Sequence, residues 1–122
     1  MIDIFRYLQT IAEDLAPTGN ARVAAAVTYK NKIVGIGVNS LKTHPLQARY
    51  ADNPYRIHLH AEVAAVVNAR RRVDLEQFGD CVLWVARVKW CEDHFELGLA
   101  KPCGGCQRFI DVIGIGDVKW TT

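Results

Sequence analysis

The chain has 122 residues, half of them hydrophobic and 23% charged, which excludes a disordered chain and fits one globular domain over residues 1–122. Its 15 basic and 13 acidic side chains leave a net charge of +2, too small to make non-specific nucleic-acid binding the first interpretation. No apolar run approaches the roughly 20 residues of a membrane-spanning helix.

The first part of the chain predicts a helix and then a β-hairpin. Its early apolar residues recur at helical spacing, at Ile4, Leu8, Ile11 and Leu15. Asp3 is a candidate N-cap, and residues 17–20 contain the residues that end a helix. Residues 21–29 and 32–39 read as two apolar strands joined by a turn. Residues 39–57 contain prolines and turn formers, which predict a loop.

The second part predicts alternating helices and strands. A helical pattern begins at Leu59 and ends at the arginines 70–72, whose charge suits a helix C-terminus and which otherwise suggest a nucleic-acid patch. Residues 81–88 predict a strand, 103–113 a helix and 117–121 a last strand. Strands separated by helices favour a sheet that is parallel in its second half.

One histidine and two cysteines form a candidate zinc site. His60 stands near the start of one predicted helix, and Cys103 and Cys106 stand at the start of the next. Two cysteines three apart in a first turn place both sulfurs on one side, where a helix N-terminus favours thiolates. Three protein ligands leave a position open for water, as in catalytic zinc sites. Glu62 is expected to point into this pocket and to move protons without binding the metal.

Two other interpretations of the cysteines are weaker. In a closed zinc site with Cys91 as fourth ligand, Glu62 would have no function. In a redox pair formed by Cys103 and Cys106, the HAE motif that begins at His60 would have no function. Cys81 opens a strand and is predicted to be a buried apolar residue. Charged residues within the first ten interrupt any secretory pattern, so we expect a cytoplasmic protein with reduced thiols.

The two motifs HAE at 60–62 and PCGGC at 102–106 resemble the H-x-E and P-C-x-x-C signature of zinc-dependent nucleobase deaminases. The sequence is similar to the cytidine/deoxycytidylate deaminase superfamily over residues of about 20–121, including the strand that ends at Asn39. Residues 39–62 are similar to short phage and bacterial deaminases within it. The resemblance implies an α/β fold, the α/β/α sandwich of the cytidine deaminase type with a central mixed sheet flanked by helices.

The resemblance also implies hydrolytic deamination of a cytosine nucleotide or nucleoside, with deoxycytidylate preferred. Zn2+ held by His60, Cys103 and Cys106 would activate a water. Glu62 would carry its proton to the ring nitrogen and later to the departing ammonia, and the Ala61 N–H would donate to the new oxygen. The low net charge and short chain favour a small substrate.

Substrate contacts are expected from Asn39 and from the loop that follows it. The resemblance implies that Asn39 contacts the sugar. Lys42 is a candidate for a substrate phosphate, His44 for the pocket border and Tyr55 for stacking on the base; each is otherwise an ordinary loop residue.

Two departures from the family pattern matter. Residues 89–101 separate the third strand from the PCGGC motif and predict an extended hairpin at the pocket rim. Many relatives continue with another helix and strand, so a neighbouring subunit of a homo-oligomer is expected to complete the pocket. The alternative functions are a deaminase of tRNA adenosine or single-stranded nucleic acid, with arginines beside the zinc, and a non-catalytic zinc-stabilised binding module, with four protein ligands.

Overall fold

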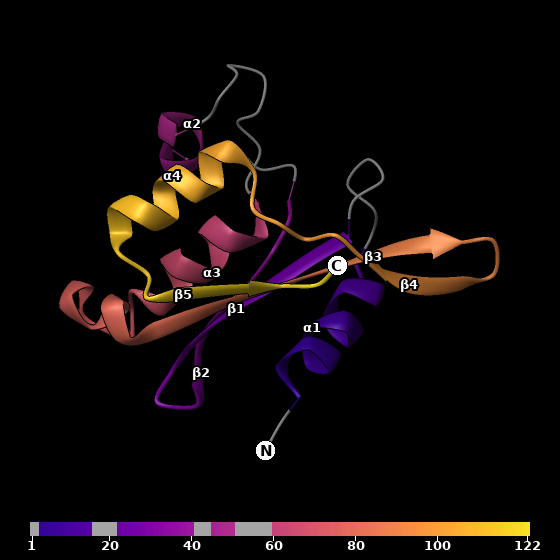
Figure 1. Ribbon diagram of the computed structural model, residues 1–122, viewed down its shortest axis with the longest axis horizontal. Coiled ribbons are helices and arrows are strands. Elements are labelled where there is room, and N and C mark those ends of the chain that lie inside the picture. The colour runs from indigo at the N-terminus through magenta and orange to yellow at the C-terminus, as the bar shows by residue number, and fades with distance from the viewer. Residues whose placement is uncertain (1–2, 16–21, 41–44, 51–59) are drawn as a thin grey trace.

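A mixed sheet lies between two layers of helices (Figure 1). The computed structural model describes residues 3–15, 22–40, 45–50 and 60–122. Its helices are α1 (Ile4–Glu13), α2 (Pro45–Tyr50), α3 (Ala61–Ala69), the short 3-10 helix η1 (Leu75–Asp80) and α4 (Gly104–Ile113). Helix α1 covers one face of the sheet, and α3 and α4 cover the other, with α2 against α4 (Figure 1). This arrangement confirms the predicted α/β/α sandwich.

The described strands form a five-stranded sheet in the order β2-β1-β3-β4, with β5 also paired to β3. They are β1 (Arg22–Tyr29), β2 (Lys32–Val38), β3 (Cys81–Cys91), β4 (His94–Gly98) and β5 (Asp117–Trp120). The β3–β5 pair is parallel, as the order of elements predicted, and the other pairs are antiparallel. Strands β5 and β4 share one edge of β3, since β5 pairs with its first half and β4 with its second half.

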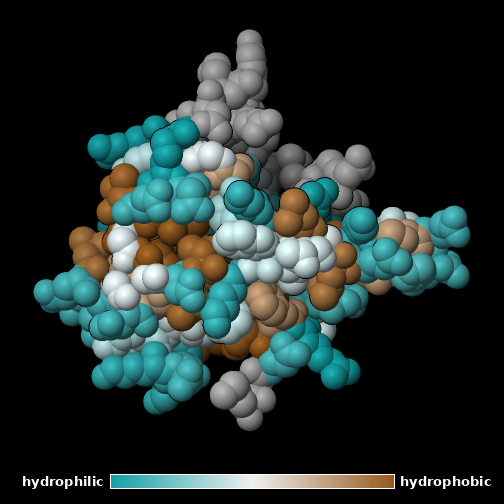
Figure 2. Space-filling view, in the orientation of Figure 1, coloured by the Kyte–Doolittle hydropathy of each residue, from teal (hydrophilic) through white to brown (hydrophobic). Residues whose placement is uncertain are grey.

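The predicted hairpin in residues 89–101 is present. Strand β3 runs on past residue 88 to Cys91, and the chain then returns as β4. The hairpin projects from the body as a mostly hydrophilic arm (Figure 2). The prediction of a loop over 39–57 is wrong at α2, which begins at Pro45, where the missing N–H costs little. Asp3 does cap α1, since its side chain accepts a hydrogen bond from the Arg6 N–H.

The side chains of β1 point alternately into two cores. Ala25 and Val27 face α3 and α4, whereas Ala24 and Ala26 face α1, where they meet Leu8. Helices cover both faces of β1, so nearly all of its side chains are apolar. This continuous apolar run is the pattern that predicted a buried strand from the sequence. Among the described residues no helix is long and apolar enough to cross a membrane.

Glycines on β2 let α3 lie directly on the sheet. A Cβ on Gly37 would collide with the backbone of Ala61 and Ala65, at the start of α3. A Cβ on Gly35 would collide with the backbone of Ala65 and Ala69. The two glycines therefore set how closely the helix that begins beside His60 approaches the strand.

We expect Gly37→Ala to lower the free energy of unfolding by about 1–3 kcal/mol, because the added methyl group must push helix backbone away from the sheet. Urea denaturation measures the change. Gly79→Ala is the matched control, since a Cβ there meets nothing within 4 Å. Equal stabilities of the two variants would show that α3 does not need this close approach.

Candidate active site

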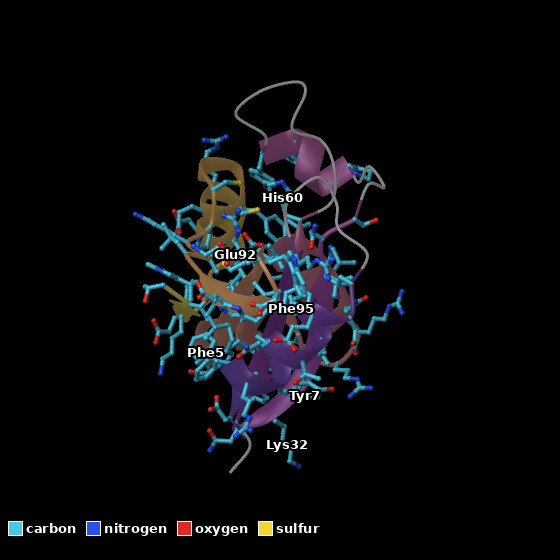
Figure 3. The ribbon with its side chains drawn as sticks, turned by 90° about the vertical axis from the view of Figure 1, so that its right-hand side faces the viewer. Phe5, Tyr7, Lys32, His60, Glu92 and Phe95 are labelled. Carbon is cyan, nitrogen blue, oxygen red and sulfur yellow. The ribbon has the colours of Figure 1, made fainter. Side chains whose placement is uncertain are left out.

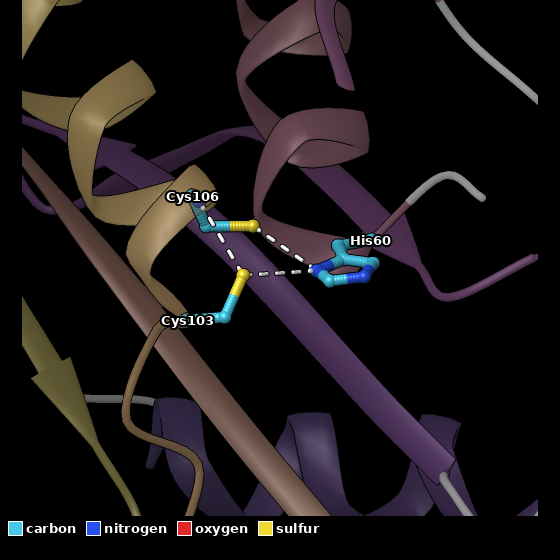
Figure 4. Close-up of side chains that lie close together, drawn as sticks. All are labelled: His60, Cys103 and Cys106. Atoms are coloured by element: carbon cyan, nitrogen blue, oxygen red, sulfur yellow. Dashed lines mark hydrogen bonds between the residues drawn. The ribbon is translucent and has the colours of Figure 1, made fainter. Parts of the chain in front are cut away.

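The N-termini of α3 and α4 bring His60, Cys103 and Cys106 together (Figure 4). His60 is the N-cap residue of α3, and Cys103 is the N-cap residue of α4. The Cys103 Sγ accepts a hydrogen bond from the Cys106 N–H at 3.4 Å, so this thiol caps its own helix. The cysteine spacing therefore places both sulfurs beside one helix end, as the sequence predicted.

The distances within this cluster suit a zinc ion. The His60 Nδ1 lies 3.2 Å from the Cys106 Sγ and 3.5 Å from the Cys103 Sγ (Figure 4). The three ligand atoms lie within 4.8 Å of one another. A tetrahedral zinc ion with ordinary bond lengths would hold a nitrogen and a sulfur about 3.5 Å apart. One imidazole nitrogen and two sulfurs are also the donors that zinc prefers, so the donor set is consistent with zinc.

The electrostatics of the cluster favour a thiolate at Cys103. Hydrogen bonding from Cys106, together with His60 and the Cys106 N–H, lowers the pKa of the Cys103 thiol to about 3. The thiolate is the form of cysteine that binds metals.

Glu62 is buried beside the same three residues, with 6% of its surface exposed. Burial raises the pKa of its carboxyl group above the ordinary value, and a hydrogen bond to its own backbone, the charge of His60 and a hydrogen bond with Cys106 lower it in part. These interactions place the carboxyl group next to the cluster. Ala61, between Glu62 and His60, is fully buried.

Asn39 lies just beyond β2 and extends its pairing with β1. Its Oδ1 accepts a hydrogen bond from the Val23 N–H at 2.8 Å, and its own N–H donates to the Val23 carbonyl oxygen at 3.2 Å. The predicted substrate contacts Lys42, His44 and Tyr55 lie outside the described residues.

Other candidate residues lie away from the cluster. Cys91, on the hairpin, donates to the Glu96 carboxylate at 3.4 Å and is not in the group of possible metal ligands found among the described residues. Cys81 is buried, as predicted. The arginines 70–72 follow the last residue of α3, whereas His60 precedes its first, and the nine-residue helix is about 14 Å long. This placement gives no support to a basic track at the site.

Thr121 was not among the residues predicted from the sequence, and it joins the strands beside the site. Its N–H donates to the Val85 carbonyl oxygen at 3.0 Å, and its Oγ1 accepts from the Arg87 N–H at 3.1 Å. The Oγ1 also donates to the Gly98 carbonyl oxygen at 2.7 Å. Thr121 thus sits where the partner of β3 changes from β5 to β4. No local pattern signals this role, because every partner is distant in sequence.

We expect Thr121→Val to lower the free energy of unfolding by about 1–3 kcal/mol, because the Arg87 N–H and the Gly98 carbonyl lose their buried partner. Thr121→Ser keeps the hydroxyl and should cost less. Chemical denaturation of both variants measures the difference. A valine variant as stable as the serine variant would contradict the role of the hydroxyl.

Comparisons with known proteins agree with this geometry. The model of the cytidine and deoxycytidylate deaminase zinc-binding region matches residues 2–122. A guanine deaminase from Bacillus subtilis is 20% identical with a TM-score of 0.57, and the match covers 98% of this chain and 64% of that one. A dCMP deaminase from the cyanophage S-TIM5 in apo form is 21% identical with a TM-score of 0.59, and the match covers 98% of this chain and 84% of that one. These two structures share the fold. A search of curated proteins gives no match.

Proposed function

The chain belongs to the cytidine and deoxycytidylate deaminase family, and from that premise we propose that it is a zinc-dependent hydrolase that deaminates a cytosine nucleotide, with deoxycytidylate as substrate. The observation that carries the proposal is the grouping of His60, Cys103 and Cys106 beside the buried carboxyl group of Glu62. His60, Cys103 and Cys106 would hold the ion. When bound, zinc would supply a nucleophile at neutral pH by lowering the pKa of a coordinated water.

Residues of the chain itself would carry out the proton transfers of this reaction. A carboxylate oxygen of Glu62 accepts a proton from the attacking water and delivers it to the ring nitrogen of the base. As the carbon–oxygen bond forms, the Ala61 N–H donates a hydrogen bond to that oxygen. Glu62 then takes up the second proton of the water and passes it to the amino group. The carbon–nitrogen bond breaks and ammonia leaves, so the product is a uracil compound.

The choice of substrate rests on several observations. A phage dCMP deaminase shares the fold, and the chain covers 84% of its length. The net charge of +2 and the distance of the arginines 70–72 from His60 favour a small molecule over a nucleic acid. Asn39 is proposed to contact the sugar, and Lys42, His44 and Tyr55 are proposed to contact the rest of the substrate. We also propose a homo-oligomer, which light scattering would measure.

Ammonia release from a panel of compounds tests the proposed function. Zinc-loaded protein would be incubated with cytidine, deoxycytidine, their mono- and triphosphates, guanine, adenosine and a single-stranded oligonucleotide. We expect turnover of deoxycytidylate, and loss of that turnover after zinc is removed by a chelator. Guanine is in the panel because a guanine deaminase shares the fold. Turnover of guanine or of the oligonucleotide without turnover of any cytosine mononucleotide would overturn the proposal.

A further inference from the structure

Arg87 lies on β3 and forms no ion pair with another residue of the described part of the chain. Its Nε is buried and has no hydrogen-bond partner among the described residues. The ion pairs found among the described residues involve His94 and not Arg87. A buried guanidinium nitrogen that lacks a partner is costly unless an anion reaches it, and guanidinium groups bind phosphates with two parallel hydrogen bonds.

The register of the sheet places Arg87 on the same face as the candidate active site. Arg87 pairs directly with Val23 of β1, and Val23 packs against the core under α3 and α4. Directly opposed residues of antiparallel strands point to the same face. Val23 in turn exchanges hydrogen bonds with Asn39, the residue proposed to contact the sugar. Asn39, Val23 and Arg87 therefore form one row across the sheet.

This row lies level with the beginning of α3. Helix α3 rests on Gly37 with its first turn, and Gly37 is in the neighbouring row with Ala25 and Val85. The row of Arg87 lies two residues along the strands from the row of Gly37, in the direction of the N-terminus of α3, where His60 is the N-cap residue. Figure 3 looks at the molecule from the hairpin side and shows His60 above the hairpin residues Glu92 and Phe95, whereas Phe5 of α1 lies below them. The face of Arg87 is thus the His60 side of the sheet.

The surroundings of Arg87 hold it in place. Its backbone N–H donates to Thr121, and Thr121 also accepts from Ala100, which lies three residues before Cys103. Its paired residue on β4 is Gly98, and the side-chain carbons of Arg87 lie 3.8 Å from the position that a Gly98 Cβ would occupy. Lys89 lies two residues further on the same strand, and the pKa of the nearby Glu96 carboxyl group is lowered mainly by its hydrogen bond with His94 and to a lesser extent by the charge of Lys89.

We propose that Arg87 binds the phosphate of the substrate and makes the site select a mononucleotide over a nucleoside or a free base. The proposal rests on the proposed function, and it adds a residue of the sheet to Lys42, the loop residue that the sequence offered as a phosphate contact. The sugar would lie between Asn39, at one end of the row, and the phosphate bound by Arg87, while the base reaches Glu62. Arg87 is a binding residue in this view and takes no part in the proton transfers.

The test compares deoxycytidylate with deoxycytidine in Arg87→Met, Arg87→Lys and the unchanged protein. Methionine keeps much of the apolar stem, and lysine keeps the charge without the fork of nitrogens. We expect the ratio of kcat/KM for the nucleotide to that for the nucleoside to fall about 100-fold in Arg87→Met and less in Arg87→Lys. Arg70→Met, at the far end of α3, is the matched control and should keep the ratio. Zinc content and melting temperature verify that each variant is folded.

A binding measurement separates failure of this inference from failure of the proposed function. Calorimetry with deoxynucleoside monophosphates of all four bases and with the matching nucleosides needs no turnover. Preference for one monophosphate over its nucleoside, lost in Arg87→Met, supports the phosphate contact even if no cytosine compound is deaminated. An unchanged kinetic ratio in Arg87→Met, or wild-type protein that binds nucleoside and nucleotide equally, would overturn the inference.

Discussion

Replacement of Glu62 by alanine is expected to lower deamination by several powers of ten while zinc stays bound. The carboxyl group is buried beside His60, Cys103 and Cys106 and is the proposed carrier of both protons. Without it, water activation and protonation of the leaving amine fail together, because one group serves both steps. The proposed zinc ligands His60, Cys103 and Cys106 are left unchanged. Steady-state ammonia release and zinc content, measured on the same preparation, test the two halves of this expectation.

Two further variants make this experiment decisive. Glu62→Gln keeps the shape of the side chain but removes the base, so it should be nearly as inactive as Glu62→Ala. Glu76→Ala removes an exposed glutamate of η1 and should retain full activity. Activity in Glu62→Ala within tenfold of the unchanged protein would refute Glu62 as proton carrier. Loss of zinc from Glu62→Ala would instead make the carboxyl group part of the metal site.

Replacement of Cys106 by serine is expected to abolish stoichiometric zinc binding and to lower the melting temperature. Cys106 is fully buried, and its sulfur lies 3.2 Å from the His60 Nδ1. Serine would replace a soft sulfur ligand by a hydroxyl group that does not ionise at neutral pH. Because the proposed zinc ion would bind the folded chain, its loss would also remove the stabilisation that it gives to that chain. Added zinc should therefore raise the melting temperature of the unchanged protein and not that of the variant.

Cys91→Ser is the matched control for the cysteine experiment. Cys91 lies on the hairpin with its thiol directed to Glu96, so we expect this variant and the unchanged protein each to bind one zinc ion. Elemental analysis after dialysis against a weak chelator gives the stoichiometry of all three proteins. Zinc retained by Cys106→Ser would remove Cys106 from the ligand set. Zinc lost from Cys91→Ser would restore the closed site with four protein ligands, and with it the non-catalytic binding module.

Local sequence predicted most elements of the fold, since the signals are local. Helical spacing and the Asp3 cap are read from neighbouring residues, and α1 begins where they indicated. The spacing of Cys103 and Cys106 predicted that both sulfurs lie at one helix end. The sequence also predicted that Glu62 shares a pocket with His60, because two residues of one first turn stay close however the rest of the chain folds. The short α2, after a proline, escaped prediction because turn formers surround it.

The sequence by itself determined the types of the elements, the two motifs and the donor set of the candidate metal site. The tertiary structure decided which distant residues meet. His60 and Cys103 are 43 residues apart in the sequence, and they come together because α3 and α4 pack on one face of the sheet. The tertiary structure also decided the row that joins Asn39, Val23 and Arg87, and the contacts of Thr121. Register is set by pairing between distant strands, and a shift of one residue would turn Arg87 to the α1 face. That choice is made by the packing of the whole sheet, so no local pattern contains it.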